Sequence, residues 1–105
     1  MEEQVNIQSR EYWFKVVEML QQNWALIDES KEGSCVVYFV GDTSGVFDEM
    51  EFQSKDEAEY ALRRNGFARY KEDKRAQEFI TPPEPPFHYR QHPNGPIYSS
   101  GRFWK

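Results

Sequence analysis

The chain has 105 residues, which is long enough for one hydrophobic core and too short for two, so we expect a single domain spanning residues 1–105. Aromatic residues make up 16% of it, which excludes a disordered chain even though 30% of the residues are charged and the mean hydropathy is -0.89. The longest apolar run, residues 35–40, is far shorter than the roughly 20 residues that cross a bilayer, and one cysteine allows no internal disulfide, so we expect a cytoplasmic protein without a membrane segment.

The net charge of -5 is unevenly distributed along the chain. Residues 1–62 carry four Lys or Arg and fourteen Asp or Glu, whereas residues 63–105 carry nine and four, so the two parts have net charges of -10 and +5. Such an arrangement is neutralised when the basic part packs on the acidic part, or else it attracts a charged partner. Internal neutralisation is the simpler expectation, and the charged partner is the alternative.

The N-terminal part is predicted to hold one helix. Residues 1–8 show no apolar period and are expected to fray. From Ser9 to Asn23 the apolar side chains recur at helical spacing, with Ser9 as the N-cap and Asn23 at the end of the helix. These apolar residues are Trp13, Val16, Val17, Leu20 and Trp24.

Three strands are predicted to follow and to form an antiparallel meander. Trp24–Glu29 alternates weakly, Cys35–Val40 is β-branched or aromatic almost throughout, and Val46–Phe52 returns after a turn at residues 42–45. The middle strand is apolar on both faces, because Cys35, Val37 and Phe39 point one way and Val36, Tyr38 and Val40 the other. A sheet with one wet face alternates apolar with polar residues, so both faces of this sheet need cover.

A second helix is predicted to begin after Ser54, because Ser54 and Glu57 fit the two ends of a capping box. Gly66 ends this helix by taking the left-handed conformation, and Phe67 folds back toward Leu62. Residues 67–70 could add a short strand and residues 73–80 a short helix, which completes a core over residues 9–80. The prolines that follow end regular structure.

We therefore predict the α+β class, with the order helix, three-stranded antiparallel meander, helix, and an aromatic C-terminal segment over residues 81–105 packed on the sheet or on a partner. The helices can cover one face of the meander, so the second face needs another layer. Aromatic residues near the C-terminus can supply it, because each buried ring removes roughly 150–250 Å² from water. These residues are Phe79, Phe87, Tyr89, Tyr98, Phe103 and Trp104.

No motif for catalysis, for a metal or for a cofactor stands out, so we predict that the protein is not an enzyme and uses no cofactor. His88 and His92 have the spacing of metal ligands on a helix, but the prolines around them argue against a helix. Cys35 lies in an apolar strand, where burial makes a thiol inert. Residues 99–102 have the parts of a small anion site and are read more simply as a turn.

The function predicted from these features is a non-catalytic protein–protein interaction module, a small acidic accessory or inhibitor-like protein whose partner is another protein or a second copy of the chain. Its acidic sheet edge or its aromatic segment would make the contact, although a solvated charged edge strand is the plainer interpretation of the acidic residues. The candidate residues are Asp48, Glu49, Glu51, Tyr98, Phe103 and Trp104.

Two alternatives stay open. The first is a nucleic-acid-binding domain that uses residues 63–75, where cations alternate with Phe67 and Tyr70, although Glu72 and Asp73 make nucleic acid a poorer fit than protein. Its contact residues are Arg63, Arg64, Arg69, Lys71, Lys74 and Arg75. The second is a small-ligand-binding protein or an enzyme with a pocket between the sheet and the C-terminal segment. Its lining would include Tyr38, His88, Tyr98 and Arg102.

Overall fold

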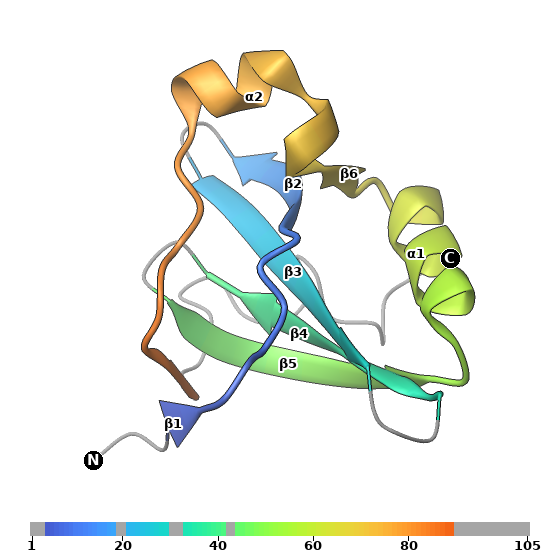
Figure 1. The fold of residues 1–105 in the computed structure, drawn as a ribbon. Coiled ribbons are helices and arrows are strands. Elements are labelled where there is room, and N and C mark those ends of the chain that lie inside the picture. Colours follow the sequence, from blue (N-terminus) through green and yellow to red (C-terminus); the bar gives the residue numbers. More distant parts are fainter. Residues whose placement is uncertain (1–3, 19–20, 30–32, 42–43, 90–105) are drawn as a thin grey trace.

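The computed structural model describes residues 4–18, 21–29, 33–41 and 44–89, which form a seven-stranded mixed sheet flanked by helices (Figure 1). The strand order is β1-β7-β5-β4-β3-β2-β6, and neighbouring strands are antiparallel except for β5 and β7, which are parallel. The strands are β1 (Gln4–Val5), β2 (Trp13–Glu18), β3 (Gln21–Glu29), β4 (Cys35–Val40), β5 (Gly45–Phe52), β6 (Ala68–Arg69) and β7 (Phe87–Tyr89). The helical elements are α1 (Lys55–Arg64), the 3-10 turn η1 (Tyr70–Glu72) and α2 (Lys74–Phe79).

The predicted order of helix, three-stranded meander and helix is wrong, because the stretch predicted as the first helix, residues 9–23, contains β2 and the start of β3. β2 pairs antiparallel with β3, in a register that opposes Trp13 to Ala25 and Phe14 to Trp24. Trp13 packs in the hydrophobic cluster on one face of the sheet, and Phe14 packs in the cluster on the other face. A strand that is buried on both faces need not alternate apolar with polar residues, so its apolar residues can fall at helical spacing by coincidence.

The later elements agree better with the prediction. β4 has the predicted bounds, whereas β3 begins at Gln21 rather than Trp24 and β5 begins at Gly45 rather than Val46. The short strand and short helix predicted after α1 are present as β6 and α2. Because β1, β2, β6 and β7 extend the sheet, the expected meander of β3, β4 and β5 is its central part.

Helix α1 begins and ends as its local sequence predicts. The Ser54 hydroxyl accepts a hydrogen bond from the Glu57 backbone N–H at 3.2 Å, which is the N-cap contact. At the other end Gly66 has a φ of +92°, in the left-handed region, and the Phe67 N–H donates to the Leu62 carbonyl at 2.9 Å. The capping chemistry of this helix is therefore encoded within a few residues of each end.

One face of the sheet, which we call the helix face, is covered by α1. Ala58, Leu62 and the following Phe67 pack there on side chains from β2, β3 and β4. The strand residues in this cluster are Trp13, Ala25, Ile27, Cys35, Val37 and Phe39, all of them buried. Alternate residues of β4 thus point to the helix face, as predicted.

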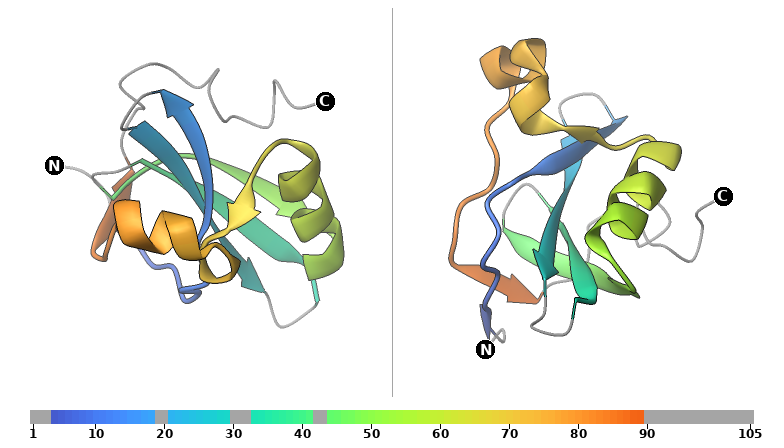
Figure 2. Two further views of the ribbon diagram at one scale, coloured as in Figure 1. Left: turned by 90° about the horizontal axis from the view of Figure 1, so that it is seen from above. Right: turned by 45° about the vertical axis from the view of Figure 1, so that its right-hand side comes forward.

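The opposite face carries a second hydrophobic cluster, which includes Phe14, Trp24, Leu26 and Val40. Two segments far apart in the sequence run side by side over this face: the N-terminal residues that lead into β2 and the residues that link α2 to β7 (Figure 2). The Tyr12 hydroxyl joins them by donating to the Pro83 carbonyl at 2.6 Å. The second face of the sheet is therefore covered around Val40, whereas Val36 and Tyr38 on the same face of β4 stay partly exposed, so the expected cover of the middle strand is only partial.

The aromatic C-terminal residues supply only part of this cover within the described chain. Phe87 is 1% exposed and packs in the second cluster, whereas Phe79 and Tyr89 are 75% and 39% exposed. Tyr98, Phe103 and Trp104 lie outside the described residues.

The N-terminal segment supplies a further part, so the expectation that residues 1–8 fray is wrong for residues 4–8. β1 pairs with β7 through Gln4↔His88 and Val5↔Phe87, and Val5 and Ile7 are buried in the second cluster. In the sequence these two apolar residues are too few to establish a period, so the pattern does not predict a strand here. Neither helix of the described chain has the length and hydrophobicity that crossing a membrane requires.

Candidate functional site

The acidic residues of β5 meet partly exposed apolar residues of β4 on the face opposite α1. In the antiparallel register Tyr38 lies across from Glu49 and Val36 across from Glu51, and paired residues share one face of a sheet. Glu49 and Glu51 are exposed, and Val36 and Tyr38 are partly exposed. We call these four residues the acidic patch.

A β-bulge in β5 decides which acidic residues belong to this patch. The register shifts between Phe39 and Val40: Asp48 opposes Phe39 and Val46 opposes Val40. Phe47 is therefore the extra residue of the bulge. Beyond the bulge, Met50 and Phe52 pack against the helix-face cluster, and Asp48 lies on their side of the strand. Asp48, predicted together with Glu49 and Glu51, is therefore separated from them.

The acidic patch has little internal neutralisation. Within the described chain neither Glu49 nor Glu51 forms an ion pair, and Glu49 Oε1 accepts a hydrogen bond from the Tyr89 hydroxyl at 3.2 Å. Partial burial, followed by the charges of Glu49 and Asp28, raises the pKa of Tyr38. Tyr38 therefore stays a neutral phenol beside two carboxylates at neutral pH.

The expected neutralisation of the acidic part by the basic part is only slightly developed among the described residues. A single ion pair there, between Arg69 Nη2 and Glu59 Oε1 at 2.9 Å, connects a cation beyond residue 62 with an acid before it. The other ion pairs join groups within the same part, such as Lys55 with Glu11 at 3.5 Å. Among the described residues, the charge asymmetry seen in the sequence is thus largely retained.

Two of the basic residues predicted for nucleic-acid contact are used within the fold. The guanidinium carbons of Arg63 and Arg69 lie 5.0 and 4.9 Å from the centre of the Trp13 ring. Glu72 Oε1 lies 3.5 Å from Arg63 Nη2 and 3.9 Å from Arg69 Nε, and Glu59 Oε1 lies 2.9 Å from Arg69 Nη2. These cations hold α1 and β6 together over Trp13 and are balanced by two carboxylates.

The remaining four members of that set lie at the surface. Arg64, Lys71, Lys74 and Arg75 are exposed and take part in no ion pair within the described chain. They belong to the end of α1, to η1 and to the start of α2. The hollow beside them is lined by both signs of charge, since Arg63, Arg69 and Lys74 share it with Glu72 and Asp73.

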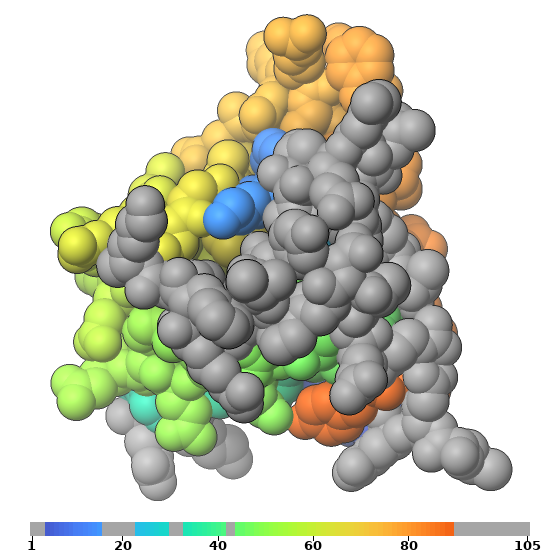
Figure 3. Space-filling model, turned by 180° about the vertical axis from the view of Figure 1, so that it is seen from behind, coloured from blue at the N-terminus to red at the C-terminus, as the bar shows by residue number. Residues whose placement is uncertain are grey.

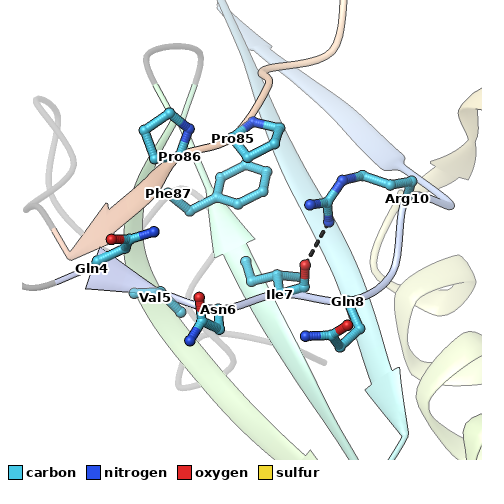
Figure 4. Close-up of a pocket in the computed structure, with 9 residues that line it drawn as sticks. All are labelled: Gln4, Val5, Asn6, Ile7, Gln8, Arg10, Pro85, Pro86 and Phe87. Atoms are coloured by element: carbon cyan, nitrogen blue, oxygen red, sulfur yellow. Dashed lines mark hydrogen bonds between the residues drawn. The ribbon is translucent and has the colours of Figure 1, made fainter.

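A pocket that sequence reasoning missed lies between the N-terminal segment and the residues before β7 (Figure 4). Its volume is about 180 Å³, and Arg10 lies at one end of it. The rest of the lining comes from Gln4, Val5, Asn6, Ile7, Gln8, Pro85, Pro86 and Phe87. No local pattern signals this pocket, because its two walls are far apart in the sequence.

Among the described residues, Tyr38 and His88, which were considered for one pocket, do not come together. Phe87 and Tyr89 point to the face opposite α1, so the alternation of β7 directs His88 to the other face, away from Tyr38. Burial, followed by the charges of Glu29 and Glu57, raises the pKa of the Cys35 thiol, whose Sγ donates to the Ser54 carbonyl at 3.3 Å. The described residues contain no group of three His, Cys, Asp or Glu side chains placed for a metal. The other candidates, His92, Tyr98, Arg102, Phe103 and Trp104, lie outside the described residues.

The surroundings of β7 complete the view of the site. In the space-filling view from behind, β7 emerges beside β5, with which it pairs in parallel (Figure 3). The Tyr89 hydroxyl reaches from β7 to Glu49, so β7 supports the border of the acidic patch.

No family model, curated protein or solved structure matches this chain. The candidate sites therefore stand on the geometry of this chain alone.

Proposed function

We propose that this protein is a non-catalytic protein-binding module that uses the acidic patch to recognise a basic segment of a protein partner. The observation that supports it is the placement of Glu49 and Glu51 next to partly exposed Tyr38 and Val36 on one face of the sheet, where neither carboxylate forms an ion pair with another described residue. Carboxylates attract the cation, and the apolar surface contacts the stem of its side chain.

Arginine suits this patch better than lysine does. Its planar guanidinium stacks on an aromatic ring and also forms paired hydrogen bonds with carboxylates, whereas the lysine ammonium is a compact, strongly hydrated charge. Tyrosine and arginine are also enriched among the residues that dominate binding energy at interfaces. The net charge of -5 adds long-range attraction for a basic partner.

The test uses an arginine-rich peptide, acetyl-GRGRGRGRG-amide, titrated into the isotopically labelled protein and followed by NMR. We expect saturable shifts of the backbone amides of Val36, Tyr38, Glu49 and Glu51. The double variant Glu49→Gln/Glu51→Gln should weaken binding by about tenfold, which corresponds to 1.4 kcal/mol. A lysine peptide of the same length should bind more weakly than the arginine peptide.

A matched control separates the acidic patch from general charge. The double variant Asp56→Asn/Glu78→Gln removes two exposed carboxylates elsewhere, on α1 and α2, and gives the same net charge. We expect it to bind the arginine peptide like the unaltered protein. Equal weakening by the two double variants, or shifts spread evenly over the surface, would contradict the proposal.

Nucleic-acid binding is kept as the competing proposal, because Arg64, Lys71, Lys74 and Arg75 are exposed and take part in no ion pair within the described residues. A labelled single strand and a labelled duplex of about 20 nucleotides, each measured at two salt concentrations, decide between the two proposals. If the protein-binding proposal holds, neither binds in a salt-sensitive way below about 100 µM. The nucleic-acid proposal replaces the protein-binding proposal if a nucleic acid binds tightly and this binding is lost when the four residues are changed to glutamine.

A further inference from the structure

Arg10 is held in one orientation by three contacts. Its Nη1 donates hydrogen bonds to the Ile7 carbonyl at 2.6 Å and to the Ser9 carbonyl at 2.7 Å. Its guanidinium carbon lies 5.4 Å from the centre of the Phe87 ring, which is buried. Figure 4 shows the guanidinium directed from the N-terminal segment toward Phe87 and Pro85. The charged group is therefore positioned at the pocket before any ligand arrives.

These contacts leave one side of the guanidinium available. The two carbonyls use the hydrogens of Nη1, and within the described chain Nε and Nη2 of Arg10 donate to no acceptor. Nε and Nη2 point in nearly parallel directions and match the spacing of the two oxygens of a carboxylate. An arginine fixed by other contacts loses little side-chain entropy when it binds such a group.

The surroundings of Arg10 favour an anionic ligand of small size. The pocket lining contains no acidic side chain, and it includes the amide side chains of Gln4, Asn6 and Gln8. Glu84 shares a neighbouring hollow with Arg10 but forms no ion pair with it. The volume of about 180 Å³ suits a single side chain or chain end, since small-molecule sites usually have about 300–1,000 Å³.

We propose that the pocket between residues 4–10 and Phe87 binds a carboxylate through Nε and Nη2 of Arg10. The carboxylate is supplied by the C-terminus or by an acidic side chain of a protein partner. This site is separate from the acidic patch, so its test does not depend on the outcome for Glu49 and Glu51.

The test titrates three small probes into the labelled protein and follows the Arg10 Nε–H and the backbone amides of Gln8 and Phe87 by NMR. N-acetylglycine presents a terminal carboxylate, N-acetylaspartic acid 1-amide presents a side-chain carboxylate, and N-acetylglycinamide presents none. We expect saturable shifts with the two acids, with dissociation constants on the order of 10 mM, and none with the amide. The acid that binds more tightly identifies the source of the carboxylate.

Variants of Arg10 show whether the guanidinium makes the contact. Arg10→Gln should abolish the saturable shifts, and Lys15→Gln, which removes one positive charge from β2, should leave them unchanged. Arg10→Lys keeps a cation beside Phe87 but lacks the paired donors, so we expect at least fivefold weaker binding. This second variant gives the answer if Arg10→Gln does not fold.

The proposal is overturned if neither acid produces saturable shifts or if the amide produces the same ones. It is also overturned if Arg10→Lys binds as tightly as the unaltered protein, because a point charge would then suffice. Glu49→Gln/Glu51→Gln should bind the acids normally, so a failure of the protein-binding proposal does not hide the result here.

Discussion

At the scale of single residues, burial decides the chemistry of Cys35. Its side chain is 1% exposed on the helix face, and its thiol donates to the Ser54 carbonyl. Removal from water disfavours the thiolate, and the carboxylates of Glu29 and Glu57 add to this effect, so the pKa of the thiol is raised. The thiolate is the reactive form of cysteine, so burial that favours the neutral thiol makes Cys35 a weaker nucleophile.

The raised pKa of Cys35 predicts that the free energy of unfolding falls as the pH rises above about 8.5, the pKa of a thiol in an unfolded chain. Above that pH the unfolded chain releases the proton while the folded protein keeps it, so the unfolded state is favoured increasingly. Urea unfolding at pH 7 and at pH 9.5 measures the fall. Cys35→Ala should be less stable at both values but should lose less between them. The same loss in both proteins would show that another group causes the decline.

At the scale of elements, α1 is specified by residues close to it in the sequence, whereas β2 is specified by contacts with distant segments. The bounds of α1 are set by Ser54 at one end and by Gly66 and Phe67 at the other, all close in sequence to the turns that they specify. β2 has no such local marks, and it is a strand because β3 and β6 pair with its two edges and hydrophobic clusters cover its two faces. A helical spacing of apolar residues does not prevail over that environment.

The N-cap of α1 can be tested directly. Ser54→Ala removes the acceptor of the Glu57 N–H and should lower the free energy of unfolding by about 1 kcal/mol. Thr81→Ala removes a hydroxyl at an exposed position and should change it by less than about 0.5 kcal/mol. Urea unfolding followed by circular dichroism compares the two. Equal effects would show that the hydroxyl of Ser54 does not cap the helix in solution.

At the scale of the whole molecule, β7 joins the two ends of the described chain. It pairs with β1 on one side and with β5 on the other, and Phe87 places its ring in the cluster opposite α1. The Ser44 hydroxyl supports the approach to β7 by donating to the Glu84 carbonyl at 2.6 Å. These contacts make residues 81–89 part of the fold, and deletion of residues 81–105 should markedly lower stability.

Two phenylalanines measure this contribution. Phe87→Ala should lower the free energy of unfolding by about 3–5 kcal/mol, because it leaves a cavity in a closed core. Phe79→Ala removes the same group from a position that is 75% exposed and should change the free energy by less than about 0.5 kcal/mol. Chemical unfolding of both variants under the same conditions is the measurement. A small effect of Phe87→Ala would mean that β7 does not close the core in solution.

In the candidate sites, as in the fold, local features could be predicted from the sequence, whereas contacts between distant segments could not. The acidic character of β5 could be predicted from its sequence, but the separation of Asp48 from Glu49 and Glu51 depends on a bulge opposite β4. The basic residues 63–75 were also visible, but the use of Arg63 and Arg69 against Trp13 depends on β2 and β6 being neighbours. Arg10 could not be singled out at all, because its partner ring, Phe87, lies near the other end of the described chain.

What the sequence by itself determined is the local chemistry: the two-sided apolar strand at residues 35–40, the caps of α1 and the uneven charge. Each of these depends on residues that are close together in the chain. Only the tertiary structure decided that residues 13–18 form a strand, that Val5 and Ile7 belong to the core, and that Arg10 meets Phe87. The physical reason is that strand pairing and burial join segments far apart in the sequence, and the energy of those contacts outweighs a local pattern.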